Sequence, residues 1–302
     1  MHSTKNAPPI SRNFPNALEK WVLAARPKTW IAGVSPVCIG ASFAMHSYLL
    51  FGATLLFALC IQIGTNFAND YFDFLKGADT SERMGPKRAV QQGWIAPASM
   101  LQATKITFGI AFLLAIPLIL SAGIWSLGIV FLSILCGVLY TGGPKPLGYL
   151  GLGELFVLIF FGPVATFGAY YVQAHAFHMP VFIAGFAPGL FSTALIVANN
   201  LRDAATDKIA KKNTLVVRFG TLFGKLEYTF FIGAPFVIPC ILIACYDASF
   251  NLLSAAFLFP IAAQLIKKAW RAQKGEEYIP LLGGSSFLFA CYTVLFILCF
   301  RL

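Results

Sequence analysis

Apolar runs of membrane-spanning length dominate this chain of 302 residues. A bilayer core about 30 Å thick requires about 20 apolar residues in a helix. Nine such runs lie near residues 29–47, 49–69, 100–121, 124–142, 152–173, 180–200, 227–246, 250–266 and 281–300. Only 11% of the residues are charged, against about 25% in soluble domains. The sequence therefore predicts an all-α polytopic membrane protein, with a polar segment 1–28 before one transmembrane domain, 29–302.

The basic residues predict how the chain is oriented. With the N-terminus placed in the cytoplasm, 21 of the 22 Lys and Arg residues fall on the cytoplasmic side, and only Arg301 falls on the other. The positive-inside rule then predicts a cytoplasmic N-terminus and an outside C-terminus. The net charge of +10 is explained by this topology, so it does not indicate nucleic-acid binding.

The acidic residues form two clusters at the cytoplasmic ends of predicted helices. Asn69, Asp70 and Asp73 end the second run, with Asp79 six residues further on, and Asn199, Asn200, Asp203 and Asp207 end the sixth. If the helices continue through them, Asn69 and Asp73 share one helix face, because residues four apart are neighbours. Asn199, Asp203 and Asp207 share a face in the same way.

Carboxylates at a membrane boundary are unfavourable unless something compensates their lost solvation. The alternative interpretation is that each cluster is a solvated helix end, with Asn and Asp as capping residues. This explains a single cluster more readily than two clusters that both end cytoplasm-directed helices. Magnesium ions prefer oxygen ligands and are commonly held by one or two carboxylates together with substrate phosphates. Two facing clusters could hold Mg²⁺ around one diphosphate, and within a membrane protein this predicts a lipid diphosphate substrate.

Basic residues near the two clusters fit the same prediction. Arg83, Lys87 and Arg88 flank a Gly-Pro turn, Lys145 follows the fourth run, and Lys212 follows the second cluster. Arg and Lys suit phosphate recognition, although topology or contact with anionic lipid explains any single base equally well. An allylic lipid that loses its diphosphate becomes a cation, which aromatic faces stabilise and a dry pocket protects from water.

The two clusters resemble the paired aspartate-rich motifs of UbiA-type intramembrane aromatic prenyltransferases. The matching segments read Asn69-Asp70-x-x-Asp73-x5-Asp79 and Asn199-x3-Asp203-x3-Asp207. Further segments resemble the branch that acts on 1,4-dihydroxy-2-naphthoate: Arg26-Pro-Lys-Thr29, Lys76-Gly77, Gly85-Pro86, Tyr140-Thr-Gly-Gly-Pro144 and Gly151-Leu-Gly-Glu154. The step of six residues from Asp73 to Asp79 also favours this branch over the 4-hydroxybenzoate branch.

The resemblance implies nine helices around a lateral cavity, in a bacterial plasma membrane with the active site facing the cytoplasm. It also implies transfer of a polyprenyl chain from polyprenyl diphosphate to the naphthoate, with loss of CO₂ and diphosphate, giving demethylmenaquinone. It implies Mg²⁺ at Asn69, Asp70, Asp73, Asp79, Asn199, Asp203 and Asp207. Asp70 lies about 100° round the helix from Asn69, which also fits a supporting role. The expected catalytic residues are Asp73, Asp203, Tyr140 and Lys145. The expected diphosphate-binding residues are Arg83, Lys87, Arg88, Lys145, Asn200 and Lys212.

Some alternatives remain open at this point. A prenyltransferase for another aromatic acceptor, such as 4-hydroxybenzoate, would carry similar motifs. A transporter is a further alternative, but transporter sites usually lie near the membrane midplane, and these acids lie at one face. Tyr140 is expected either to stabilise the cation or to help deprotonate the aromatic hydroxyl. Glu154 is expected either to pair with a base such as Lys145 or to act in catalysis.

Overall fold

The computed structural model describes residues 15–78 and 85–301, and within these ranges it contains helices and no strands. The α-helices are α1 (Ala17–Ala25), α2 (Ile31–Phe43), α3 (Tyr48–Leu75), α4 (Pro97–Ala122), α5 (Ser126–Leu139), α6 (Gly153–Ile159), α7 (Ala165–Ala174), α8 (Met179–Ala184), α9 (Phe186–Ile209), α10 (Leu215–Gly233), α11 (Val237–Tyr246), α12 (Phe259–Arg271) and α13 (Ile279–Arg301). Shorter helical segments are η1 (Pro27–Thr29), η2 (Leu147–Tyr149), η3 (Phe160–Val164), η4 (Ala234–Phe236), η5 (Phe250–Leu258) and η6 (Gly275–Tyr278).

Each predicted apolar run is mostly helical, and the all-helical prediction is confirmed for the part of the chain that the structure describes. Within residues 15–78 and 85–301, seven helical stretches are long and apolar enough to cross a membrane: Tyr48–Leu75, Pro97–Ala122, Gly153–Ala174, Met179–Ile209, Leu215–Tyr246, Phe250–Arg271 and Gly275–Phe300. The other two runs form the shorter apolar helices Ile31–Phe43 and Ser126–Leu139. The count of nine spans and the orientation of the termini stay predictions.

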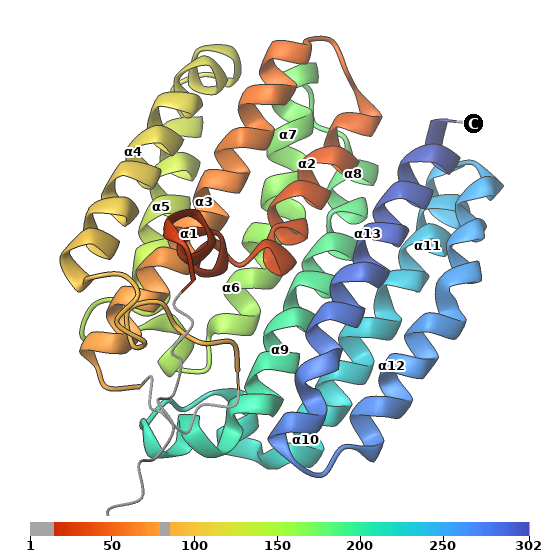
Figure 1. The fold of residues 1–302 in the computed structure, drawn as a ribbon. Coiled ribbons are helices and arrows are strands. Elements are labelled where there is room, and N and C mark those ends of the chain that lie inside the picture. Colours follow the sequence, from red (N-terminus) through yellow and green to blue (C-terminus); the bar gives the residue numbers. More distant parts are fainter. Residues whose placement is uncertain (1–14, 79–84, 302) are drawn as a thin grey trace, which may run out of the picture.

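Helix α9 lies at the centre of the bundle and packs against α2, α6, α10 and α13 (Figure 1). It is rich in small residues along its first half, and Ala187, Ala194 and Ala198 are almost completely buried. Small side chains let neighbouring helices approach closely. On the other side of the bundle, α3 packs along α4 and contacts α2 and α5.

The two helices that carry the acidic clusters extend beyond the predicted apolar runs. Helix α3 continues to Leu75 and α9 continues to Ile209. Gly77, with φ +66°, follows the end of α3, and Lys211, with φ +57°, follows the end of α9. Both clusters therefore lie on helix, and the residues four apart within each cluster share a face.

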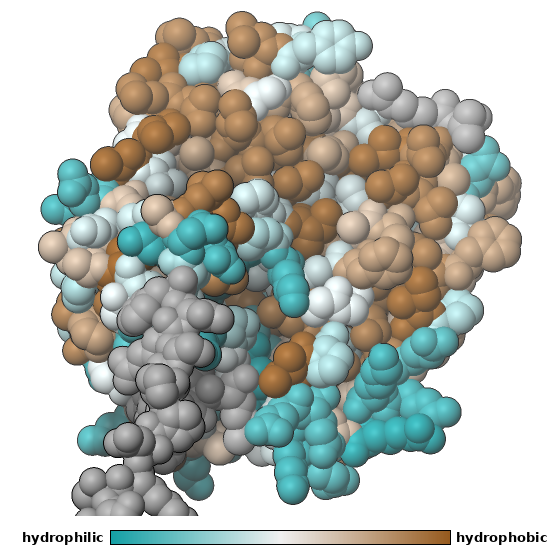
Figure 2. Space-filling model, in the orientation of Figure 1, coloured by the Kyte–Doolittle hydropathy of each residue, from teal (hydrophilic) through white to brown (hydrophobic). Residues whose placement is uncertain are grey.

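The surface is apolar over the upper part of the bundle, and hydrophilic residues gather at its lower end (Figure 2). Large apolar side chains such as Leu120, Phe131 and Phe257 are exposed on the helices, as expected where a protein contacts lipid. The described parts of the connections after α3, α5, α9 and α12 lie in the lower half of the bundle (Figure 1). The clusters at the ends of α3 and α9 therefore lie at one end of the bundle.

Candidate active site

A cavity of about 330 Å³ lies between the ends of α3 and α9, and residues of both helices line it. We call it the polar cavity, and its polar lining comprises Arg26, Lys28, Thr29, Gln62, Thr65, Asn66, Asn69, Asp70, Asp73, Lys87, Arg88, Tyr140, Thr141, Ser192, Asn199, Asn200, Arg202, Asp203 and Lys212. Asp73 and Asp203 are 130 residues apart in the sequence. The fold thus brings residues of both acidic motifs to one cavity.

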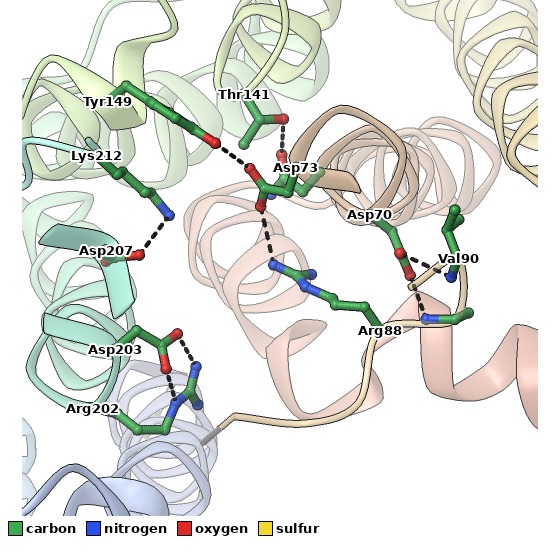
Figure 3. A network of polar contacts seen from close by, with 12 residues as sticks. Asp70, Asp73, Arg88, Val90, Thr141, Tyr149, Arg202, Asp203, Asp207 and Lys212 are labelled. Carbon is green, nitrogen blue, oxygen red and sulfur yellow. Dashed lines mark hydrogen bonds and ion pairs between the residues drawn. The ribbon is translucent and has the colours of Figure 1, made fainter. Parts of the chain in front are cut away.

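Asp73 is buried at the end of α3 and holds two partners from other segments. Arg88 Nη2 donates to Asp73 Oδ2 at 3.3 Å, and Tyr149 Oη donates to Asp73 Oδ1 at 3.0 Å (Figure 3). One turn earlier, Asn69 Oδ1 accepts a hydrogen bond from Thr141 Oγ1 at 2.8 Å. The face shared by Asn69 and Asp73 therefore points toward the connections after α3 and α5.

Asp70 has a different environment from Asp73. Its two carboxylate oxygens accept hydrogen bonds from the backbone N–H groups of Ala89 and Val90, at 3.0 and 3.2 Å (Figure 3). These contacts attach the segment that carries Arg88 to α3. They fit the supporting role expected from the position of Asp70 on the helix, and its role as a metal ligand stays a prediction.

The two carboxylates of the second motif also form ion pairs with basic side chains of the protein. Arg202 Nε and Nη2 donate to the two oxygens of Asp203 at 2.7 and 2.6 Å. Lys212 Nζ lies 3.7 Å from Asp207 Oδ1 (Figure 3). Asp207 does not line the polar cavity, whereas Asp203 does. A guanidinium that contacts both carboxylate oxygens forms the strongest geometry of this kind.

Asn200 and Glu154 form a buried contact between α9 and α6. Asn200 Nδ2 donates to Glu154 Oε1 at 2.7 Å. Asn200 lines the polar cavity and Glu154 does not. The observed partner of Glu154 is thus an amide of the second motif.

The predicted bases differ in where they lie. Lys87, Arg88 and Lys212 line the polar cavity. Lys145 is exposed and is not part of that lining. The structure thus does not bring Lys145 to the cavity with the others, and the roles predicted for Asp79 and Arg83 fall outside the described residues.

The segment that follows the first motif also contacts α9. A Cβ atom at Gly85 would lie 2.7 Å from Nη2 of Arg202, closer than real side chains allow. Glycine at this position lets the backbone pass over the guanidinium that holds Asp203. This contact joins the Gly-Pro turn noted in the sequence to the second motif.

Several lining residues are not among those predicted from the sequence. Gln62 Nε2 and Asn66 Nδ2 donate to Thr29 Oγ1 at 3.0 and 3.1 Å, and Asn66 Nδ2 also donates to the carbonyl of Ala25 at 3.0 Å. These bonds fasten the segment carrying Arg26 to α3. The sequence does contain a signal for them, because Gln62 and Asn66 are amides four residues apart within an apolar run.

Lys76 connects the end of α3 to the segment after α5. Its ammonium donates to the carbonyls of Thr141 and Gly143 at 2.6 and 3.0 Å, and lies 4.8 Å from the ring centroid of Tyr149. Partial burial lowers the pKa of Lys76, and the negative charge of Asp73 acts in the opposite direction. The sequence indicates Lys76 only as part of a matching segment, and its contacts come from the fold.

The donor chemistry of the polar cavity fits a magnesium ion. The carboxylates of Asp73 and Asp203 and the amides of Asn69 and Asn199 line the same space, and such hard oxygen donors suit Mg²⁺. Within residues 15–78 and 85–301, no three His, Cys, Asp or Glu side chains lie together as a ready metal site. Arginine and lysine side chains hold the carboxylates instead, so a divalent ion would compete with them.

A second, apolar cavity of about 150 Å³ adjoins the first. We call it the apolar cavity, and its lining includes Val37, Phe57, Ile61, Leu118, Trp125, Ile129, Val130, Phe156, Phe160, Val164 and Tyr171. Thr65, Tyr140, Val157 and Phe161 line both cavities. The polar end and the apolar end therefore meet around Tyr140.

Comparisons with solved structures show the same fold. A UbiA homolog from Archaeoglobus fulgidus, bound to GPP and Mg²⁺, matches with a TM-score of 0.66 at 12% identity, over 94% of this chain and 100% of that chain. The apo structure of a UbiA homolog from Aeropyrum pernix K1 matches with a TM-score of 0.67 at 12% identity, over 88% of this chain and 96% of that chain.

Curated relatives are similar over most of their length. A 1,4-dihydroxy-2-naphthoate octaprenyltransferase from Mycobacterium tuberculosis is 35% identical over 267 residues, which cover 87% of this chain and 90% of that protein. The Haemophilus influenzae protein of the same name is 33% identical over 309 residues, covering 92% and 94%. The model of the UbiA prenyltransferase family matches residues 33–298. The similarity to both sets of proteins and the match to the family model lead to one conclusion: this chain belongs to the UbiA prenyltransferase family.

Proposed function

We propose that this protein transfers a polyprenyl group from polyprenyl diphosphate to 1,4-dihydroxy-2-naphthoate, releasing diphosphate and CO₂ and giving demethylmenaquinol, the hydroquinone form of demethylmenaquinone. The junction of the two cavities at Tyr140 is the observation that carries the proposal. A polyprenyl diphosphate has an anionic head and a long apolar tail, and the two cavities match these two parts. The names of the relatives from M. tuberculosis and H. influenzae support the naphthoate acceptor.

The polar cavity is suited to the diphosphate. Arg88, Lys87 and Lys212 line it, and we assign them to the diphosphate oxygens because guanidinium and ammonium groups bind phosphate well. Asn200 lines the same space. We also propose Arg83 and Lys145, predicted from the sequence, as residues that bind the diphosphate.

Magnesium binding is assigned to the two motifs. We propose Asn69, Asp73, Asn199 and Asp203, which line the polar cavity, as the main ligands, with Asp70, Asp79 and Asp207 as the further positions predicted from the sequence. When bound, Mg²⁺ would stabilise the negative charge that develops on the departing diphosphate. The related Archaeoglobus structure with GPP and Mg²⁺ supports this assignment.

The reaction exchanges one bond for another. The bond between the first prenyl carbon and the diphosphate oxygen breaks, and its electron pair leaves with the diphosphate. The aromatic ring of the acceptor bonds to that carbon, and the electron pair of the departing carboxyl group returns to the ring as CO₂ leaves. Tyr140, at the junction of the cavities, presents a ring that can stabilise the prenyl cation, and the apolar lining excludes water.

We also propose the membrane topology predicted from the sequence. The protein has nine spans, a cytoplasmic N-terminus and an outside C-terminus, with the polar cavity open to the cytoplasmic side of a bacterial plasma membrane. The clustering of the connections after α3, α5, α9 and α12 at one end of the bundle supports it (Figure 1). Basic residues of those connections include Lys76, Lys87, Arg88, Lys145, Lys211, Lys212 and Lys274.

A competition assay tests the function. The protein in nanodiscs receives Mg²⁺, a polyprenyl diphosphate, and equal amounts of 1,4-dihydroxy-2-naphthoate and 4-hydroxybenzoate, and mass spectrometry identifies the product. We expect a decarboxylated prenyl naphthohydroquinone, detected as the quinone after oxidation by air, which is absent with EDTA and absent in Asp73→Ala. If only 4-hydroxybenzoate is prenylated, the proposed naphthoate acceptor is contradicted. If neither acceptor is prenylated, the proposed prenyl transfer is contradicted.

A further inference from the structure

The connection between α5 and α6, residues 141–152, contacts both halves of the polar site. On the side of the first motif, Thr141 Oγ1 donates to Asn69 Oδ1 at 2.8 Å. The carbonyls of Thr141 and Gly143 accept hydrogen bonds from Lys76 at 2.6 and 3.0 Å. The start of this connection is therefore fastened to the end of α3.

The later part of the same connection is fastened to the segment that follows the second motif. The backbone N–H of Asn213 donates to the carbonyl of Tyr149 at 3.1 Å. Arg218 Nη2 donates to the carbonyl of Leu150 at 2.7 Å. Gly151 has φ +69°, and a Cβ atom there would lie 3.0 Å from the carbonyl oxygen of Asn213. The close approach of these two segments depends on that glycine.

Tyr149 is the residue of this connection whose side chain reaches toward both motifs. Its hydroxyl donates to Asp73 Oδ1 at 3.0 Å. Its ring centroid lies 5.6 Å from Lys212 Nζ, and that ammonium lies 3.7 Å from Asp207 Oδ1. Figure 3 shows the side chain pointing from the connection toward Asp73, with Lys212 and Asp207 nearby.

We propose that Tyr149 is a positioning residue that sets the orientation of Asp73 relative to the second motif. The inference rests on the proposed function in one respect: it takes Asp73 as a ligand of the divalent ion. Groups that hydrogen-bond to a metal ligand fix its orientation, and their loss typically weakens metal binding about 10–100-fold. The ring adds a second effect, because an aromatic face attracts the ammonium of Lys212.

Two substitutions separate the hydroxyl from the ring. Tyr149→Phe keeps the ring beside Lys212 and removes the hydrogen bond to Asp73, whereas Tyr149→Leu removes both. Tyr48→Phe is the matched control, since it removes a tyrosine hydroxyl at the far end of α3, where Tyr48 is 84% exposed.

The measurement is direct binding of Mn²⁺, followed by electron paramagnetic resonance, in the full chain in nanodiscs with geranyl diphosphate and no acceptor. We expect about tenfold weaker Mn²⁺ binding in Tyr149→Phe and a larger loss in Tyr149→Leu, with Tyr48→Phe unchanged. The unfolding temperature without ligand should be the same in Tyr149→Phe and the unsubstituted protein, which separates positioning from a general loss of stability.

Equal Mn²⁺ binding by Tyr149→Phe and the unsubstituted protein would overturn the inference. So would an equal loss in Tyr48→Phe, or an absence of Mn²⁺ binding by the unsubstituted protein. The competition assay for prenyl transfer is independent of this result. Weakened Mn²⁺ binding by Tyr149→Phe, without any prenylated product from the unsubstituted protein, would support the positioning role and contradict the proposed function. Unchanged Mn²⁺ binding by Tyr149→Phe, together with prenylated product, would support the proposed function and contradict the positioning role.

Discussion

Arg88 and Asp73 form a buried ion pair with 3.3 Å between Nη2 and Oδ2, and their side chains are only 7% and 3% exposed. The two residues are separated by 15 positions in the sequence. The pair forms because Asp70, one turn before the end of α3, binds the backbone of Ala89 and Val90 and holds Arg88 beside the helix. Asp70 thus positions Arg88, and Arg88 forms the ion pair with Asp73 of the same motif.

Arg88→Ala should weaken both the fold and the site. Removing one partner of a buried ion pair leaves the other charge poorly compensated, so we expect the free energy of unfolding to fall by about 3 kcal/mol. We also expect the KM for polyprenyl diphosphate to rise about tenfold or more, because the guanidinium proposed to bind the diphosphate is lost. Thermal unfolding and steady-state kinetics measure the two effects. Arg271→Ala, an exposed base at the end of α12, is the control, and an equal effect there would contradict the prediction.

Lys212→Ala and Lys145→Ala should differ in their effect on substrate binding. Lys212 lines the polar cavity, whereas Lys145 is exposed and lies outside its lining. We expect Lys212→Ala to raise the KM for polyprenyl diphosphate about tenfold, and Lys145→Ala to raise it less. Kinetics with varied polyprenyl diphosphate measure this. A larger rise in KM for Lys145→Ala than for Lys212→Ala would support the diphosphate-binding role predicted for Lys145 from the sequence. It would contradict the expectation from the structure that Lys212 matters more.

Trp125→Ala should change the preference for prenyl chain length. Trp125 and Tyr140 flank α5, so they lie about 22 Å apart along a helix axis with a rise of about 1.5 Å per residue. Trp125 and Tyr171 both line the apolar cavity, and their rings contact edge to face with centroids 5.0 Å apart. We expect the smaller side chain to raise kcat/KM for long donors relative to geranyl diphosphate. Trp270→Ala, on α12 outside both cavities, should leave that ratio unchanged.

Gly40→Ala should destabilise the bundle, and Gly52→Ala should not. A Cβ atom at Gly40 of α2 would collide with the carbonyl of Thr166 on α7, whereas nothing lies within 4 Å of a Cβ atom at Gly52 of α3. Overpacking of this kind lowers the free energy of unfolding by about 1–3 kcal/mol. Thermal unfolding in detergent compares the two variants. Equal unfolding temperatures would show that α2 and α7 can separate without loss of stability.

Removing divalent ions should abolish activity and leave the fold intact. Arg88, Arg202 and Lys212 contact the carboxylates of Asp73, Asp203 and Asp207, so those charges stay compensated without a metal. We therefore expect EDTA to stop prenyl transfer with little change in the unfolding temperature in the absence of substrate. Added Mg²⁺ should restore the activity, and a large drop in unfolding temperature would show that the metal also supports the fold.

The class of fold and the two motifs follow from the amino-acid sequence. Apolar runs of bilayer length permit little other than membrane helices, because backbone groups in lipid must be bonded within their own segment. The spacing of Asn69 with Asp73, and of Asn199 with Asp203, places each set on one helix face. Such local periodicity needs only the geometry of a helix, so it can be predicted without knowing how the helices pack.

Which residues share a cavity with those motifs depends on the packing of the helices. Tyr149 and Thr141 contact Asp73 and Asn69 from the connection after α5, which the fold places beside the end of α3. Lys145, predicted from its charge, is exposed. The positive-inside pattern cannot separate a base that binds substrate from a base that sets topology, because both carry the same charge on the same side. Only the packing of α9 against α6, and of the 85–90 and 141–152 segments against α3, determines where each side chain points.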